Sequence, residues 1–148
     1  MIEKTASVHW EGQGKKGLGQ ISTQTEALQA YPYGFGSRFE DDRRGTNPEE
    51  LIGAAHAACF TMACSFACDK AGYATASVDT TAKVRLVQQG EGFAIDRIAL
   101  TLDAVVPGMN EATFQDIAEA AKKGCPVSKA LASVPEITLS ANLRHEAS

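Results

Sequence analysis

The sequence lacks several features that mark specialised classes of protein. It has no excess of positive charge, because 14 Lys and Arg stand against 18 Asp and Glu to give a net charge of −4, whereas nucleic-acid-binding proteins usually carry a basic face. Residues 1–12 contain no apolar stretch of the kind that a secretory signal peptide needs. The 148 residues show no internal repeat or low-complexity tract. We therefore expect one cytoplasmic domain spanning residues 1–148, with no nucleic-acid partner.

Charge is also missing from one long run inside the chain. From Leu51 to Cys68 there is no Asp, Glu, Lys or Arg. The run is just long enough to span a membrane, but Gly, Ala, Ser, Thr, Cys and His outnumber its large apolar residues. This composition favours a buried core helix, and we expect no contact with a membrane.

Local signals mark both ends of the helix that contains this run. Asn47 is a good N-cap, and Pro48 suits the first helical position. Glu50 follows Asn47 at the spacing of a capping box, and Gly72 suits the position after the last turn. These signals predict a helix over residues 48–71, about 36 Å long. One chain of this size can hardly surround so long an apolar helix, so we predict that the helix packs against its copy in a second subunit.

Alternating apolar and polar residues predict strands on both sides of this helix. Before the helix we expect a half-buried hairpin and a short strand, at residues 6–11, 20–25 and 37–39. After it we expect two strands, two helices and a last strand, at residues 77–87, 93–106, 110–124, 125–134 and 137–143. Because the strands come in hairpins rather than alternating with helices, the predicted class is α+β with antiparallel sheet.

The four cysteines are expected to be reduced thiols, since no secretory signal is visible. Three of them share the long helix with His56, and these are ligand types that zinc prefers. Cys59, however, lies about 140° around the helix from Cys64 and about 180° from Cys68. These side chains cannot share one ion, and we expect no metal. Cys64 and Cys68 are interpreted as packing residues, and no chemistry is assigned to His56.

Cys59 and Cys125 are the cysteines that could work together in catalysis. Cys125 stands at the start of a short helix, where free N–H groups and the helix dipole favour a thiolate. Cys59 lies in mid-helix and needs a cation or a hydrogen-bond donor, for which Arg38 is a candidate. A thiolate, a cation and a second thiol are what a peroxide-cleaving cysteine requires. Sequence spacing does not establish whether residues 59 and 125 meet.

Five stretches of the sequence match one known family over several consecutive residues. They are "HWEG" at 9–12, "PYGF" at 32–35, "RFE" at 38–40, "GTNPEELIGAAHAACF" at 45–60 and "GCPVSKAL" at 124–131. With them the chain closely resembles the family of osmotically inducible protein C (OsmC) and organic hydroperoxide resistance proteins (Ohr), and in particular the OsmC branch. The resemblance covers nearly the whole chain. It implies an α+β OsmC-like fold with antiparallel sheets around long central helices, assembled as an intertwined homodimer.

The resemblance also implies an activity and a site. Members of the family are thiol-dependent peroxidases that reduce organic hydroperoxides, and hydrogen peroxide less efficiently, without a metal or an organic cofactor. The match carries the peroxidatic cysteine onto Cys59 and the resolving cysteine onto Cys125. The disulfide between them would be reset by an external dithiol, such as a lipoylated protein.

The family's arginine and glutamate fall on Arg38 and Glu49, although Arg43 and Arg44 lie in the same loop. Glu49 precedes Cys59 by ten residues, about 15 Å along one straight helix. If Glu49 serves the Cys59 site, it most simply does so from the partner subunit.

Two other classes of function stay open beside the enzyme. One is a redox sensor, in which oxidation of Cys59 and Cys125 changes the binding of a partner. The other is a dimer that binds an apolar ligand, with the cysteines incidental. Tyr33, Phe35 and Phe39 could line an apolar pocket, or they could pack in an ordinary core.

Overall fold

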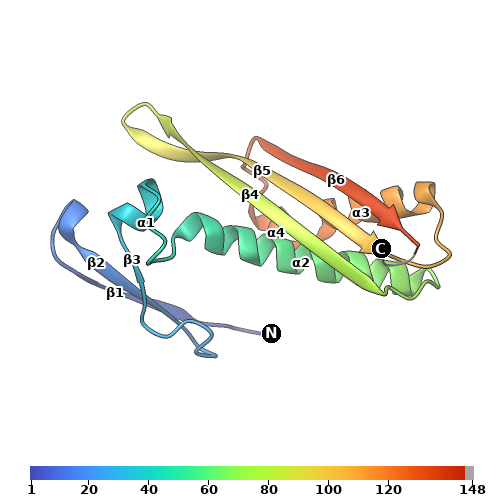
Figure 1. Ribbon diagram of the computed structural model, residues 1–148, viewed down its shortest axis with the longest axis horizontal. Helices are drawn as coiled ribbons and strands as arrows, with labels where there is room; N and C mark the ends of the chain where they lie inside the picture. The colour runs from blue at the N-terminus through green and yellow to red at the C-terminus, as the bar shows by residue number, and fades with distance from the viewer. Residues whose placement is uncertain (146–148) are drawn as a thin grey trace. The chain divides into compact units, whose positions relative to one another are not determined.

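A computed structural model of the chain describes residues 1–145 and gives a mixed α+β architecture, as predicted (Figure 1). The elements in chain order are β1 (Ala6–Glu11), a 3-10 helix (Gly14–Lys16), β2 (Leu18–Thr23), β3 (Tyr31–Tyr33), α1 (Phe35–Phe39), α2 (Pro48–Lys70), β4 (Ser77–Gln89), β5 (Gly92–Val105), α3 (Glu111–Gly124), α4 (Pro126–Ala130) and β6 (Glu136–Arg144). The contacts divide the chain into two compact units, Met1–Leu51 and the residues from Ile52 onward.

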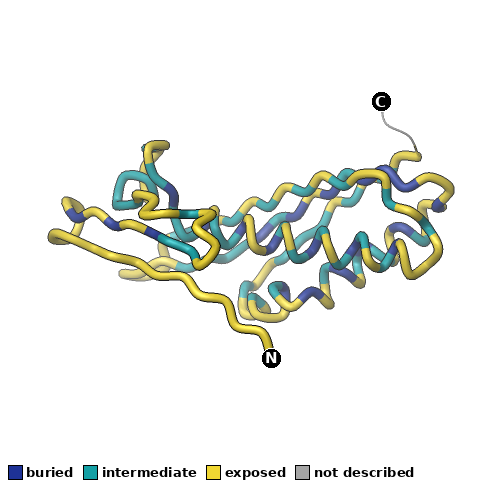
Figure 2. Tube along the Cα trace, turned by 90° about the horizontal axis from the view of Figure 1, so that it is seen from below, coloured by how far each residue is buried: buried dark blue, intermediate teal, exposed yellow. Residues whose placement is uncertain are grey.

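The first unit contains a three-stranded antiparallel sheet in the order β1-β2-β3. The predicted hairpin is confirmed, and the Trp10 ring meets Tyr33 edge-on at 5.7 Å. Only glycine fits under this ring, because a Cβ at Gly17 would lie 2.3 Å from it. The predicted half-burial of β1 is wrong. Every residue of this edge strand is exposed, as Figure 2 shows from the N-terminus onward.

The short strand predicted at residues 37–39 is also wrong. That segment is the helix α1, and the third strand of the sheet is β3. The reason is local hydrogen bonding: the Gly34 N–H donates to the Ser37 hydroxyl at 3.0 Å, and this hydroxyl lies 2.7 Å from the Thr46 carbonyl. Ser37 therefore stabilises a helical turn where the sequence pattern indicated a strand.

Helix α2 begins at Pro48 as predicted and ends at Lys70, one residue before the predicted end. The Asn47 side chain accepts the Glu50 N–H at 2.7 Å, and Gly72 follows the last turn with a φ of +94°. The Glu50 carboxylate accepts the Thr46 hydroxyl at 2.6 Å. Within residues 1–145, α2 is the one helix whose length and composition would suit a membrane span, a test that core helices also pass.

The second unit contains a sheet in the order β4-β5-β6. β4 and β5 form the predicted antiparallel hairpin, with a bulge between Arg85 and Leu86. β6 corrects the expectation of a wholly antiparallel sheet, since it runs parallel to β5. The reason is the connection: α3 and α4 form a crossover between the two strands, which returns the chain in the same direction.

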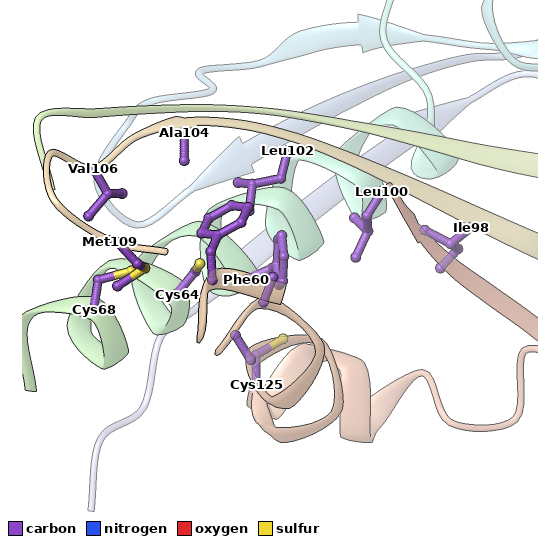
Figure 3. Close-up of a cluster of buried hydrophobic side chains, with 13 residues drawn as sticks. Phe60, Cys64, Cys68, Ile98, Leu100, Leu102, Ala104, Val106, Met109 and Cys125 are labelled. Carbon is purple, nitrogen blue, oxygen red and sulfur yellow. The ribbon is translucent and has the colours of Figure 1, made fainter. Parts of the chain in front are cut away.

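The core of the second unit lies between one face of this sheet and the helices (Figure 3). Helix α2 contributes Phe60, Cys64 and Cys68, which pack against alternate residues of β5 and against α3. Cys125, at the start of α4, reaches the same cluster. The core thus joins the middle of α2 to the start of α4, two segments far apart in sequence.

The opposite side of α2 is apolar but exposed. Ala55, Ala58, Met62 and Phe66 follow one another at three- or four-residue spacing, and Phe66 is 67% exposed. We call these four residues the α2 stripe. An open groove of about 450 Å³ runs along part of it beside Thr80. The single chain therefore does not surround this helix, in keeping with the sequence analysis.

Candidate active site

The two cysteines singled out by the sequence lie in contact. Cys59 is in the middle of α2, and Cys125 is the N-cap of α4, as predicted. Both are free thiols, and they lie near enough for each to shift the pKa of the other. The sequence could not establish this contact. The packing of α4 against α2 creates it.

The surroundings of Cys125 favour its thiolate. Burial acts to raise the pKa of Cys125, but hydrogen bonds to its sulfur outweigh burial and lower this pKa. The largest come from the Ser128 hydroxyl and from the Ser128 N–H, whose nitrogen lies 3.3 Å from Sγ. Cys59 and the Val127 N–H add to them. This is the N-cap effect that the sequence indicated.

The surroundings of Cys59 favour its protonated form. Burial raises the pKa of Cys59, and the neighbouring Cys125 raises it further, against a hydrogen bond from the Val127 N–H. In the reduced pair, negative charge therefore resides more easily on Cys125. Cys59 needs a further positive group before it can be a thiolate.

Arg38 and Glu49 form the second pair of candidate residues. The guanidinium donates from Nε to Oε1 at 3.1 Å and from Nη2 to Oε2 at 3.0 Å. The Glu49 side chain is only 10% exposed and that of Arg38 37%. Such a bidentate, charge-assisted pair holds a guanidinium in one orientation. A cation held in one orientation can stabilise the negative charge of a thiolate.

The neighbouring arginines have different partners. Arg43 pairs with Asp41 at 3.4 Å on the exposed surface, and Arg44 pairs with Asp42 at 2.8 Å. Hydrogen bonds from Arg44 lower the pKa of Asp42 to about 2. These exposed pairs differ from that of Arg38, whose carboxylate partner is buried. Geometry therefore favours Arg38 among the three arginines of the loop.

A pocket of about 450 Å³ opens in the first unit, beside the helix α1 that carries Arg38. Tyr33 and Phe35 line it, as does Lys15, whose ammonium lies 4.9 Å from the Phe35 ring centroid. Phe39, also considered from the sequence, packs against the Phe35 ring instead. The pocket offers both apolar and cationic surface to a ligand.

The remaining two cysteines lie in the core, as interpreted from the sequence (Figure 3). Cys64 and Cys68 are each 1% exposed, close to Met109 and Val106. Burial raises the pKa of Cys64 to about 12, and burial also raises the pKa of Cys68. Neither thiol is suited to nucleophilic chemistry. Within residues 1–145, no three His, Cys, Asp or Glu side chains come together as metal ligands.

His56 was named from the sequence without being assigned any chemistry, and Ser128 was not singled out. His56 is fully buried on α2, and its Nε2 lies 2.7 Å from the Ser128 hydroxyl. That hydroxyl in turn accepts from the Cys125 thiol at 3.1 Å. A signal for Ser128 was present, because it stands three residues after the N-cap Cys125, where capping partners occur. The sequence held no such signal for His56.

Comparison with known proteins gives consistent matches. The sequence model of the family described as OsmC-like protein matches residues 39–140. Peroxiredoxin OsmC of Escherichia coli strain K12 is 51% identical over 97% of this chain and 98% of its own. An organic hydroperoxide resistance protein of Xanthomonas axonopodis pv. citri is 34% identical over 64% of this chain and 66% of its own. The crystal structure of an organic hydroperoxide resistance protein from Elizabethkingia anophelis superposes with a TM-score of 0.72 at 27% identity, covering 95% of this chain and 96% of that one.

The burial of Cys64 and Cys68 predicts a sharp difference in thiol reactivity. At pH 8 a thiol with a pKa of about 12 is ionised in roughly one molecule in ten thousand. We expect iodoacetamide to label these two residues at least about tenfold more slowly than Cys59 in the native protein, and at similar rates in urea. Peptide mass spectrometry at timed quenches measures this. Equal native rates at Cys59 and Cys64 would contradict the assignment of Cys64 to the core.

Proposed function

The chain belongs to the OsmC-like protein family and is a peroxidase, and we propose that it reduces organic hydroperoxides to alcohols by a two-cysteine mechanism. Hydrogen peroxide would be a poorer substrate. The observation that carries the proposal is the contact between Cys59 and Cys125. Two free thiols in contact, one of them half-exposed on a helix, are the minimum that such a mechanism requires. Relatives named for peroxiredoxin activity and for organic hydroperoxide resistance support it.

In the first step the Cys59 thiolate attacks one oxygen of the hydroperoxide. The O–O bond breaks, the alcohol leaves with a proton, and Cys59 becomes a sulfenic acid. Arg38 stabilises the thiolate and the departing oxygen, which supplies the positive group that Cys59 lacks. Glu49 holds the guanidinium through the bidentate pair.

In the second step Cys125 attacks the Cys59 sulfur. A disulfide forms and water leaves, and the two cysteines are already neighbours in the reduced chain. An external dithiol, such as a lipoylated protein, then restores both thiols by exchange. The four free cysteines fit a reducing compartment such as the cytoplasm.

We place the complete site in a homodimer. Glu49 and Cys59 are separated by about 15 Å along α2, so the Arg38–Glu49 pair most simply serves the Cys59 of a second copy. The α2 stripe supports this, because an exposed apolar helix face needs a cover and its small residues allow a second helix to approach closely. The pocket beside Tyr33 and Phe35 would then receive the organic group of the substrate.

The first test is turnover of cumene hydroperoxide with dithiothreitol by the wild type, Cys59→Ser and Cys125→Ser. We expect Cys59→Ser to lose at least about a thousandfold in kcat/KM, since it removes the nucleophile. Cys125→Ser should still consume one equivalent of hydroperoxide but leave Cys59 open to dimedone. Cys68→Ala is the matched control and should retain activity. A wild type that is oxidised once without turnover would indicate a redox sensor, and hydroperoxide consumption by Cys59→Ser would exclude the proposed nucleophile.

The choice of Arg38 among the loop arginines has a separate test. Arg38→Lys keeps the charge but loses the bidentate pair with Glu49, so we expect kcat/KM to fall about 10- to 100-fold. Arg43→Lys changes an exposed arginine just after α1 and should stay within about twofold. Steady-state kinetics with both variants measure this. A larger loss in Arg43→Lys than in Arg38→Lys would reverse the assignment.

The dimer proposal predicts that assembly and activity are lost together. Phe66→Glu places a charge in the α2 stripe, far along α2 from Glu49, and should yield a folded monomer with less than about 1% of the activity. Phe66→Leu keeps the stripe apolar and should remain an active dimer. Light scattering and peroxidase assays at matched concentrations measure both. Full activity in a verified monomer would refute the shared site.

A further inference from the structure

His56 is a buried titratable group that the mechanism above does not use. It lies on α2 three residues before Cys59 and is fully buried. Its Nδ1 has no hydrogen-bond partner among the described residues, whereas Nε2 lies 2.7 Å from the Ser128 hydroxyl. A buried ring nitrogen without a partner lowers stability. Its position beside the cysteine pair suggests a function that offsets this cost.

Ser128 connects this imidazole to a reacting sulfur. The Cys125 thiol donates to the Ser128 hydroxyl at 3.1 Å, and the Ser128 N–H donates back to the same sulfur with its nitrogen at 3.3 Å. Ser128 is itself buried in the first turn of α4. Cys125, Ser128 and His56 therefore form a continuous chain, and Cys59 touches its sulfur end.

A serine hydroxyl can serve both protonation states of such a chain, because it has one donor and two acceptor positions. While Cys125 is a thiol, Ser128 accepts its proton and can donate to Nε2 of His56. Once Cys125 is a thiolate, Ser128 can donate to the sulfur and accept from a protonated Nε2. Burial lowers the pKa of His56, which favours the neutral imidazole at rest, and Nε2 is an acceptor in the tautomer that carries its proton on Nδ1.

We propose that Ser128 and His56 take the proton from Cys125 as this thiol attacks the sulfenic acid on Cys59. The step rests on the proposed function, and its atoms balance. The S–S bond forms while the S–O bond of the sulfenic acid breaks, so that Cys125 is oxidised and the Cys59 sulfur is reduced. The proton passes through the Ser128 hydroxyl to Nε2 of His56, and it returns by way of the same hydroxyl to the hydroxide that leaves Cys59, which becomes water. Ser128 touches a reacting atom, whereas His56 is a positioning residue that acts through it.

A purely structural role for the bond between His56 and Ser128 makes a different prediction. It would hold α2 against α4, and any side chain that preserves the hydrogen bond would replace the imidazole. His56→Gln separates the two roles, because an amide can bond to the Ser128 hydroxyl but takes up no proton at neutral pH. Ser128→Ala removes the connection itself. Lys129→Ala, at an exposed neighbour on α4, is the matched control.

The test is a single turnover with one equivalent of cumene hydroperoxide, quenched with dimedone or acid. In His56→Gln and Ser128→Ala we expect hydroperoxide loss within about threefold of the control, but disulfide formation slowed about 10- to 100-fold. Dimedone-labelled Cys59 should accumulate in both. The double variant should be no slower than the slower single variant, because a relay acts as a unit. Disulfide formation at the control rate in His56→Gln would overturn the relay.

A second measurement needs no hydroperoxide. Reaction with Ellman's reagent converts Cys59 to a mixed disulfide, and attack by Cys125 releases the second thionitrobenzoate, whose colour gives the rate. The same two variants should slow this release, and urea midpoints measured in parallel confirm that they are folded. Release at the control rate in both would also overturn the relay. If the wild type does not react with hydroperoxide but the two variants still release thionitrobenzoate more slowly than the control, the proposed function is refuted and the relay is supported.

Discussion

The chemistry depends on one packing contact, where the middle of α2 meets the start of α4. Phe60 is fully buried against the sheet, and Cys59 beside it is only partly covered. The phase of the helix is therefore fixed by its core face, since each residue turns the chain by about 100°. A helix rotated by one residue would direct the thiol away from Cys125. The hydrophobic core thus aligns two sulfurs from distant segments, which a hydrogen bond within one segment cannot do.

The surroundings of this contact determine which of the two cysteines loses its proton more easily. Burial disfavours the thiolate of either cysteine, and hydrogen bonds from α4 reverse this only for Cys125, whose pKa is lowered while that of Cys59 is raised. As the proposed nucleophile, Cys59 would therefore need an added cation, which the oriented Arg38 guanidinium is suited to provide.

The four cysteines illustrate how the environment decides the use of one residue type. Cys64 and Cys68 share a helix with Cys59, yet they face the sheet and have raised pKa values from burial. Cys125 is as buried as they are, but the Ser128 N–H and hydroxyl stabilise its charge. Exposure alone therefore does not distinguish Cys125 from the two packing cysteines. The hydrogen bonds that lower the pKa of Cys125 do.

Much of this protein could be predicted from local signals in the sequence. The N-cap at Asn47, the glycine after α2 and the N-cap cysteine of α4 act within a few residues, so periodicity and capping rules found these helices. Motif resemblance supplied the roles of Cys59 and Cys125 and the placement of Arg38 and Glu49. The capping signals act over a few residues, and the motifs are shared with a known family, so both can be recognised in the sequence alone.

Tertiary structure decided what depends on contacts between distant segments. β6 runs parallel to β5 because α3 and α4 form a crossover between them. The alternation of residues within a strand does not show the direction in which the strand pairs. The helix α1 replaced an expected strand because the Ser37 hydroxyl finds its partners in Gly34 and Thr46. The meeting of the two thiols, and the chain from Cys125 to His56, join residues up to 72 positions apart. Such contacts are selected by the packing of a whole core, and no single stretch of sequence contains them.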